Sequence, residues 1–173
     1  MKIGGVTMLF APKGNLVTNG DFEEGTPGAP PEGWISTNVT LTGPDAAFTG
    51  EQAALLGGTS PGEPAVLYQD VNVSPLRRYQ LSVQLAAPAR PAGDLIIEVR
   101  WLDPAQTDAG VGLHAYVPDA SLGVLPLGVW DAQVHVTDCV PLGACMARIL
   151  FTRSARPGAL PTVMDAVTFA DIG

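Results

Sequence analysis

Apolar and polar residues alternate one by one along several short runs of the chain. The run 79–85 reads Tyr-Gln-Leu-Ser-Val-Gln-Leu, and the runs 133–136 and 147–152 follow a similar pattern. An alternation with a period of two gives a strand one face that packs against a core and one that meets water. The pattern therefore predicts β-strands at residues 15–22, 34–42, 51–57, 64–73, 77–87, 94–103, 110–117, 129–137, 146–153 and 162–171.

The breaks between these runs are rich in turn-forming residues. They include residues 26–31 (Thr-Pro-Gly-Ala-Pro-Pro), 57–62 (Gly-Gly-Thr-Ser-Pro-Gly) and 88–93 (Pro-Ala-Arg-Pro-Ala-Gly). Parallel βαβ units would need helical crossovers of about a dozen residues or more, and no segment shows a helical period over that length. We therefore expect an all-β fold, an antiparallel two-sheet β-sandwich of the jelly-roll type, with less than about 10% helix.

Composition supports one globular domain and argues against a nucleic-acid partner. The chain has 173 residues, of which 46% are hydrophobic, which suits one domain with a sizeable core. Its formal net charge of -8 would repel the phosphate backbone of a nucleic acid. We expect a sandwich domain over residues 13–173, preceded by an N-terminal extension at residues 1–12.

The N-terminal extension is apolar but short. Its short apolar stretch covers only residues 6–11, whereas a signal-peptide core needs ~7 to 15 apolar residues and a membrane span ~20. We expect no signal peptide and no membrane insertion. The extension contains Val6, Met8, Leu9 and Phe10, and three roles remain open for it: a strand added to the sheet edge of a second copy, an edge strand of its own sandwich, or a tail.

Two cysteines, Cys139 and Cys145, enclose the sequence Val-Pro-Leu-Gly-Ala. The spacing is not a usual zinc spacing, and neither His114 nor His135 has a neighbouring ligand pattern. A loop between two strands would bring the cysteines opposite each other, where a disulfide would stabilise it. Two reduced, half-buried thiols are the alternative, and the sequence leaves both open.

The sequence gives no sign of a catalytic centre. It contains no H-E-x-x-H, Walker or G-x-G-x-x-G pattern. Asp94, Glu98 and Asp103 are close in sequence, but the first and last stand at the ends of a predicted strand and Glu98 shares a face with Arg100. We therefore expect a protein that is not an enzyme.

Four segments carry a family resemblance. They are residues 15–25 (Asn-Leu-Val-Thr-Asn-Gly-Asp-Phe-Glu-Glu-Gly) followed by Gly33-Trp34, residues 48–56 (Phe-Thr-Gly-Glu-Gln-Ala-Ala-Leu-Leu), residues 68–83 (Tyr-Gln-Asp-Val-Asn-Val-Ser-Pro-Leu-Arg-Arg-Tyr-Gln-Leu-Ser-Val) and residues 164–169 (Met-Asp-Ala-Val-Thr-Phe). In this order they resemble the jelly-roll carbohydrate-binding modules of the galactose-binding-like superfamily, especially the cellulose- and xylan-associated type. The chain also has a looser similarity to stand-alone modules of spore-forming bacteria.

This resemblance implies a structural calcium ion between the first and last strands. Matched by motif, the carboxylates of Glu23 and Asp165 would be ligands, and backbone oxygens near Gly50 would complete part of the shell. Calcium favours such a mixture of carboxylate and carbonyl oxygens. The alternative from the residues alone is that Asp165 caps a turn and Glu23 is solvated.

The resemblance also implies aromatic platforms on which a sugar ring stacks. The candidates in this sequence are Trp101, Trp130, Tyr116 and Tyr68. Trp101 alternates in phase with apolar residues of its predicted strand, so core packing is the competing interpretation for it.

Two functions follow as hypotheses. The first is a non-catalytic, carbohydrate-binding-like module whose partner is a polysaccharide. The second is a self-assembling structural subunit of a bacterial or spore surface layer or filament, in which residues 1–12 add a strand to another copy. Both place the protein outside the cell or at the cell or spore surface.

Overall fold

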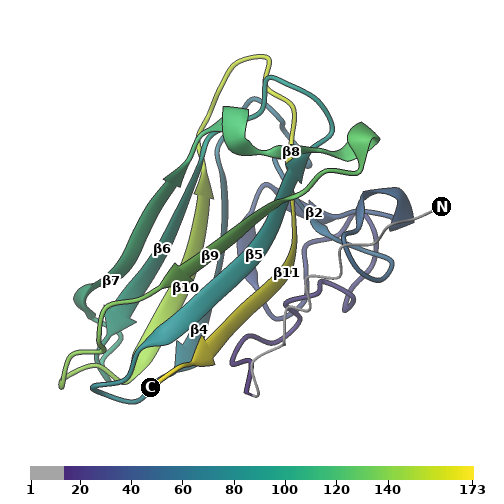
Figure 1. Cartoon of the computed structure of the whole chain (residues 1–173). Helices are drawn as coiled ribbons and strands as arrows, with labels where there is room; N and C mark the ends of the chain where they lie inside the picture. Colours follow the sequence, from purple (N-terminus) through teal and green to yellow (C-terminus); the bar gives the residue numbers. More distant parts are fainter. Residues whose placement is uncertain (1–13) are drawn as a thin grey trace.

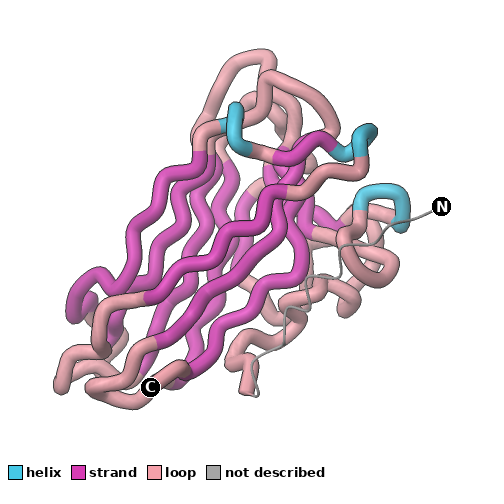
Figure 2. The backbone as a smooth tube through the Cα atoms, in the orientation of Figure 1, coloured by secondary structure: helices cyan, strands magenta, loops and turns pink. Residues whose placement is uncertain are grey.

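Eleven β-strands form the regular structure of residues 14–173, the part of the chain that the computed structural model describes (Figure 1). Helix within this range is limited to three short 3-10 turns, Pro44–Ala46, Asp119–Ser121 and Leu125–Leu127 (Figure 2). None of its helices is long and apolar enough to cross a membrane. The strands are β1 (Ile35–Thr37), β2 (Val39–Leu41), β3 (Ala54–Leu56), β4 (Ala65–Asn72), β5 (Tyr79–Ala87), β6 (Leu95–Leu102), β7 (Asp108–Val117), β8 (Gly123–Val124), β9 (Asp131–Val136), β10 (Met146–Arg153) and β11 (Thr162–Asp171).

The strands form two sheets that pack face to face, as expected for a β-sandwich. The five-stranded sheet has the order β1-β4-β10-β6-β7, and the six-stranded sheet has the order β2-β3-β11-β5-β8, with β9 also paired to β5. In Figure 1, β5, β9 and β11 of the second sheet lie in front of β6, β7 and β10 of the first. Neighbouring strands pair antiparallel, except for two residues of β8 that run parallel to β5.

The core lies between the sheets and is built from alternate residues of each strand. Leu67 of β4, Ile149 and Phe151 of β10 and Leu81 of β5 are fully buried, whereas their sequence neighbours on the other face are partly exposed or polar. Trp101 is only 2% exposed and belongs to this core. Burial of such apolar side chains is the main favourable contribution to folding.

One end of the sandwich closes around a buried arginine. Arg153, the last residue of β10, is fully buried, and its guanidinium donates hydrogen bonds to the carbonyl oxygens of Glu63 (3.1 Å) and Leu160 (2.6 Å). Burial lowers the pKa of Arg153 because an apolar interior disfavours the charged form. Arg153 therefore ties the β3–β4 and β10–β11 loops to the end of the core.

The structure corrects two predicted strands and adds one. Residues 34–42 form two strands in different sheets, because Asn38 between them adopts a left-handed conformation (φ 56°) that turns the chain. Residues 15–22 form no strand, since positive φ values at Asn19 (47°) and Phe22 (56°) interrupt the extended chain. The short strand β8 was not predicted, because two residues are too few to show a period.

A glycine substitution tests the packing of β7 against the core. A Cβ atom at Gly112 would lie 2.3 Å from Cζ2 of Trp101, whereas one at Gly143 would have no neighbour within 4 Å. We expect Gly112→Ala to lower the free energy of unfolding by about 1–3 kcal/mol, because the buried indole ring must move. Gly143→Ala, the matched control, should stay within about 0.5 kcal/mol of wild type in urea unfolding. Equal stability of the two variants would contradict this packing.

Candidate functional site

The outer face of the five-stranded sheet carries a continuous row of side chains. Strand register places Thr37, Val66, Thr152, Ile96 and Tyr116 side by side on β1, β4, β10, β6 and β7. The middle three are half-buried, and the two end residues are exposed. Four spacings of ~4.8 Å give the row a width of about 19 Å. The face therefore offers an extended, partly apolar surface that crosses the strands.

Tyr116 is the aromatic residue of this row. Its side chain is 60% exposed, and its hydroxyl donates a hydrogen bond to Oδ2 of Asp94 at 2.7 Å. This bond raises the pKa of Tyr116 and, with a second bond from the backbone of Asp119, lowers the pKa of Asp94. The ring is thus a flat, exposed surface whose polar end is fixed.

Tyr68, on β4, lies on the same face as Tyr116, but one side of its ring is covered. The guanidinium carbon of Arg148 lies 4.4 Å from the centre of the Tyr68 ring, a cation–π contact. Two nitrogens of Arg148 also donate to the two carboxylate oxygens of Asp70, each at 2.8 Å. This bidentate pair raises the pKa of Arg148 and holds its guanidinium over the ring.

A second group of ion pairs, centred on Arg100, lies on the same face. Arg100 donates to Asp108 at 2.8 Å and to Glu98 at 3.0 Å, and these partners raise its pKa. Nδ1 of His114 lies 3.3 Å from Oε1 of Glu98. Register places Arg100 beside Arg148. Since carboxylates neutralise both guanidinium groups, the face presents fixed hydrogen-bonding groups rather than an excess of positive charge.

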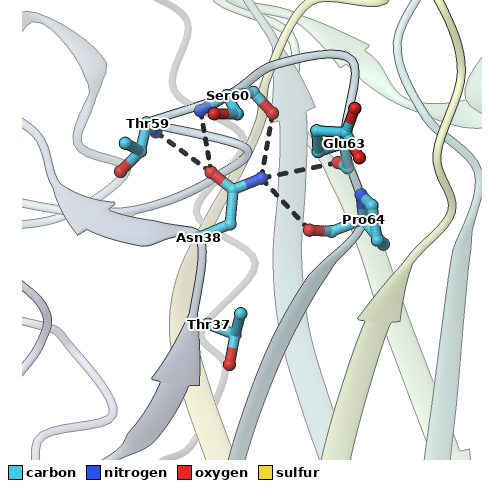
Figure 3. Close-up of a pocket in the computed structure, with 6 residues that line it drawn as sticks. All are labelled: Thr37, Asn38, Thr59, Ser60, Glu63 and Pro64. Carbon is cyan, nitrogen blue, oxygen red and sulfur yellow. Dashed lines mark hydrogen bonds between the residues drawn. The ribbon is translucent and has the colours of Figure 1, made fainter.

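A cavity of about 400 Å³ lies beyond the β1 end of the row (Figure 3). Asn38 stabilises the β3–β4 loop that forms one wall of this cavity. Its Oδ1 accepts hydrogen bonds from the backbone nitrogens of Thr59 (3.2 Å) and Ser60 (2.9 Å). Its Nδ2 donates to the carbonyl oxygens of Ser60 (2.9 Å) and Pro64 (3.1 Å). These hydrogen bonds hold the β3–β4 loop in place, and the lining also includes Thr37, Thr59, Ser60, Glu63 and Pro64.

The four predicted platforms separate into three environments. Tyr68 and Tyr116 lie on the outer face of the five-stranded sheet. Trp101 is buried, so the platform prediction for it is wrong, and the competing expectation of core packing holds. Trp130 precedes β9 of the other sheet, where its ring contacts that of Phe48 edge-to-face at 5.4 Å. Trp130 and Phe48 therefore lie outside the row on the five-stranded sheet.

Sequence reasoning missed most polar members of the site. Asn38, Asp70 and Arg148 were not predicted, although all three are polar residues at breaks or outward positions of alternating runs. Alternation marks a residue as outward-facing, but only the strand register shows that Arg148 meets Asp70. The signal was therefore present in the sequence, without the information on which strands are neighbours.

A separate feature is the carboxylate of Asp165, which is buried at the β11 bulge. The side chain is 0% exposed, and its Oδ2 accepts hydrogen bonds from the backbone nitrogens of Phe48 (2.8 Å) and Thr49 (2.9 Å). Burial raises the pKa of Asp165 to about 6 despite these bonds, and the charge of Glu23 adds to the rise. Asp165 therefore anchors the loop between β2 and β3.

Glu23 holds the same loop from a second side. Its Oε1 accepts hydrogen bonds from the backbone nitrogens of Glu51 and Gln52, both at 2.9 Å. A Cβ atom at Gly50, where φ is +67°, would lie 2.3 Å from that oxygen, so only glycine allows this approach. Oε1 of Gln52 is buried with no hydrogen-bond partner among the described residues. Two carboxylates and an unpaired amide oxygen are thus gathered around one loop.

The oxygens of this donor set are of the kinds that calcium binds. Calcium binds carboxylate, amide and carbonyl oxygens, and all three kinds surround the 48–52 loop. No group of three or more His, Cys, Asp or Glu side chains suited to a metal occurs between residues 14 and 173. A cation here would therefore depend on amide and backbone oxygens in addition to Glu23 and Asp165.

The remaining predicted residues are placed as follows. Cys139 and Cys145 are free thiols, the first exposed and the second half-buried, so the disulfide is not formed in this structure. The Arg78 guanidinium lies 3.4 Å from Sγ of Cys139. Val6, Met8, Leu9 and Phe10 fall outside the described residues.

No family model matches the chain, and no curated protein matches it in sequence. Solved structures match its fold. The chain aligns with a family 16 carbohydrate-binding module with a TM-score of 0.64 and 22% identity, over 90% of this chain and 99% of that one. The chain has the jelly-roll fold of carbohydrate-binding modules. It also aligns with TmCBM61, solved in complex with β-1,4-galactotriose, with a TM-score of 0.59 and 16% identity over 91% of this chain and 99% of that one.

The same fold occurs within enzymes. The chain aligns with the enzymatically active domain of tailspike protein 4 of bacteriophage CBA120, with a TM-score of 0.70 and 20% identity over 91% of this chain. It spans only 21% of that longer chain. A cyclase from Fischerella sp. TAU also matches, with a TM-score of 0.62. At these identities the similarity establishes the fold alone, and function must be argued from the site.

The raised pKa of Asp165 predicts a pH dependence of stability. The pKa is about 6 in the folded chain, against about 3.9 in an unfolded one. The folded state therefore binds the proton more tightly, and this stabilising contribution is present below pH ~4 and lost as the pH rises through about 6. In the presence of a chelator, wild type should lose on the order of 2 kcal/mol of unfolding free energy relative to Asp165→Asn between pH 4.5 and 7. Parallel pH profiles of the two proteins would contradict the shift.

Proposed function

We propose that this chain is a non-catalytic module that binds a polysaccharide across the outer face of its five-stranded sheet. The observation that carries the proposal is the row of side chains from the exposed Tyr116 on β7 to Thr37 at the cavity beyond β1. The similar carbohydrate-binding modules support it through their shared fold. A polymer partner also suggests a location outside the cell or at its surface, where such polymers occur.

The chemistry of the row suits a sugar chain. One face of a pyranose ring is apolar and would pack on the Tyr116 ring and on Ile96, which are neighbours in register. Sugar hydroxyls would bond to the neighbouring carboxylates and guanidinium groups, such as those of Glu98 and Arg148. Their ion pairs hold these groups in place before binding, which reduces the entropy cost of association.

The electrostatics of Asp94 and Asp108 argue against a general-acid role for these two carboxyl groups in glycoside hydrolysis. A general acid needs a raised pKa so that it is protonated near neutral pH. Hydrogen bonds lower the pKa of Asp94, and a backbone hydrogen bond and Arg100 lower that of Asp108. Neither carboxyl group is thus suited to donate a proton.

One segment matches the letters of the G-x-S-x-G nucleophile motif, namely Gly58-Thr-Ser-Pro-Gly62. It lies in the loop between β3 and β4, whereas the nucleophile of that motif stands on a strand-to-helix turn. The backbone nitrogen and oxygen of Ser60 both bond to Asn38. The segment therefore serves as the wall of the cavity in this proposal.

Binding measurements with matched variants test the proposed face. Isothermal titration calorimetry with cellohexaose, xylohexaose, mannohexaose and β-1,4-galactotriose should show binding of at least one oligosaccharide by wild type. Tyr116→Ala should weaken that affinity by about thirtyfold or more, as for the central aromatic residue of an interface.

Trp130→Ala serves as the comparison on the opposite sheet. It removes an aromatic ring that does not belong to the row, so it should leave affinity within about twofold of wild type. If Trp130→Ala abolishes binding and Tyr116→Ala does not, the ligand binds the other face. If wild type binds no oligosaccharide, the proposed function is wrong.

We further propose that Glu23 and Asp165, with oxygens of the 48–52 loop, hold a structural calcium ion. A bound cation would offset the repulsion between the two carboxylates that helps to raise the pKa of Asp165. It would also supply a partner for the buried Oε1 of Gln52. In this role the ion would fix the β2–β3 loop and take no part in sugar binding.

Calcium should therefore raise the melting temperature, because a ligand that binds only the folded state stabilises it by about 2.7 kcal/mol at 100 times its Kd. Differential scanning fluorimetry in calcium and in chelator measures the shift, which Asp165→Ala should abolish. Asp45→Ala, an exposed acid on the same loop, should retain it. Identical melting curves of wild type in calcium and in chelator would exclude the site.

The alternative function, self-assembly through residues 1–12, depends on a segment outside the described residues. None of the structures named above is a filament or spore-surface protein. Self-assembly therefore stays a hypothesis from the sequence, and the carbohydrate-binding proposal is the one that the described face supports.

A further inference from the structure

The hydroxyl of Tyr116 is the first member of a chain of hydrogen bonds that leads away from the proposed sugar-binding face. It donates to Oδ2 of Asp94, the residue just before β6, at 2.7 Å. The other oxygen of that carboxylate, Oδ1, accepts a hydrogen bond from the backbone nitrogen of Asp119 at 2.9 Å. Both oxygens of Asp94 are therefore occupied, and the carboxylate cannot rotate without breaking a bond.

The next link fixes Asp119 itself. Its Oδ2 accepts a hydrogen bond at 2.8 Å from Nη1 of Arg156, which lies in the loop between β10 and β11. The same nitrogen of Arg156 lies 3.3 Å from the carbonyl oxygen of Ala92. Three segments far apart in sequence, around residues 92–94, 116–119 and 156, thus meet behind one aromatic ring.

This arrangement matters because Tyr116 is 60% exposed and has few packing contacts to restrict it. An exposed tyrosine without such a bond rotates about its side-chain torsions and must be ordered when a ligand stacks on it. Ordering one side chain on association weakens affinity by about twofold to tenfold. A hydroxyl held by an ionised carboxylate removes most of that cost before the ligand arrives.

Given the proposed function, we infer that Asp94 positions Tyr116 as a preordered sugar platform, and that Asp119 and Arg156 hold Asp94 in place. Asp94 is a positioning residue, since it acts on the ligand only through the tyrosine ring.

Two variants isolate the anchor from the ring. Tyr116→Phe keeps the stacking surface and loses only the hydroxyl, whereas Asp94→Ala removes the acceptor and keeps the whole tyrosine. Each should weaken the affinity for the best-binding oligosaccharide of the four by about threefold to tenfold. Tyr116→Ala should lose more than either. Asp138→Ala, an exposed acid in the loop after β9, should change affinity by less than about twofold.

A readout without ligand separates positioning from a general loss of structure. The hydrogen bond from Asp94 raises the pKa of Tyr116, so the ultraviolet titration of tyrosine in wild type should contain a component above the ordinary tyrosine range of about 10. The amplitude of that component should fall by one tyrosine in Tyr116→Phe, and the same one tyrosine should return to the ordinary range in Asp94→Ala, while both variants keep the β circular dichroism spectrum of wild type.

The outcomes are distinct. Loss of the high tyrosine component together with the threefold to tenfold loss of affinity supports the anchor. If Tyr116→Phe and Asp94→Ala bind as tightly as wild type while Tyr116→Ala does not, the ring binds sugar without an anchor and this inference is wrong. If wild type binds none of the four oligosaccharides, the proposed function fails, and the inference fails with it.

Discussion

The register of β10 between β4 and β6 determines both faces of the five-stranded sheet. Because side chains alternate along a strand, the same eight residues that bury Ile149 and Phe151 in the core must present Arg148 and Thr152 on the outside. A slip of one residue would place Arg148 in the core and Ile149 in water, which burial energies strongly disfavour. The position of every polar group on the outer face therefore depends on the packing of the inner face.

This constraint explains how a partly charged surface remains ordered. Register brings Arg148 opposite Asp70 on β4 and beside Arg100 on β6, and each guanidinium then bonds a carboxylate. Exposed ion pairs contribute little to stability, and salt screens them. Their effect here is geometric: they hold hydrogen-bonding groups at fixed positions along a face about 19 Å wide. A rigid surface of this kind is suited to binding, whereas acid catalysis would require a carboxyl group with a raised pKa.

The fold was largely predictable because periodicity reports burial, and burial defines strands. The long strands β4 to β7 and β9 to β11 lie within a few residues of the predicted runs. The same reasoning favoured the core for Trp101. What sequence could not provide is which strands are neighbours, so Tyr68 and Tyr116 could not be assigned to one face or Trp130 to the other. Nor does alternation reveal a single left-handed residue such as Asn38, which separates β1 from β2 and supports the wall of the cavity.

Backbone-amide NMR during a titration with the four oligosaccharides tests the central claim, that ligand binds on the outer face of the five-stranded sheet. The account predicts that the largest chemical-shift changes follow the row across β4, β10, β6 and β7, with a maximum near Tyr116 and further changes at the β3–β4 loop around Ser60. Amides of β5, β9 and β11 should change little, because the core separates the two sheets. Chemical-shift changes concentrated on β5, β9 and β11, or no change with any of the four sugars, would contradict binding on this face.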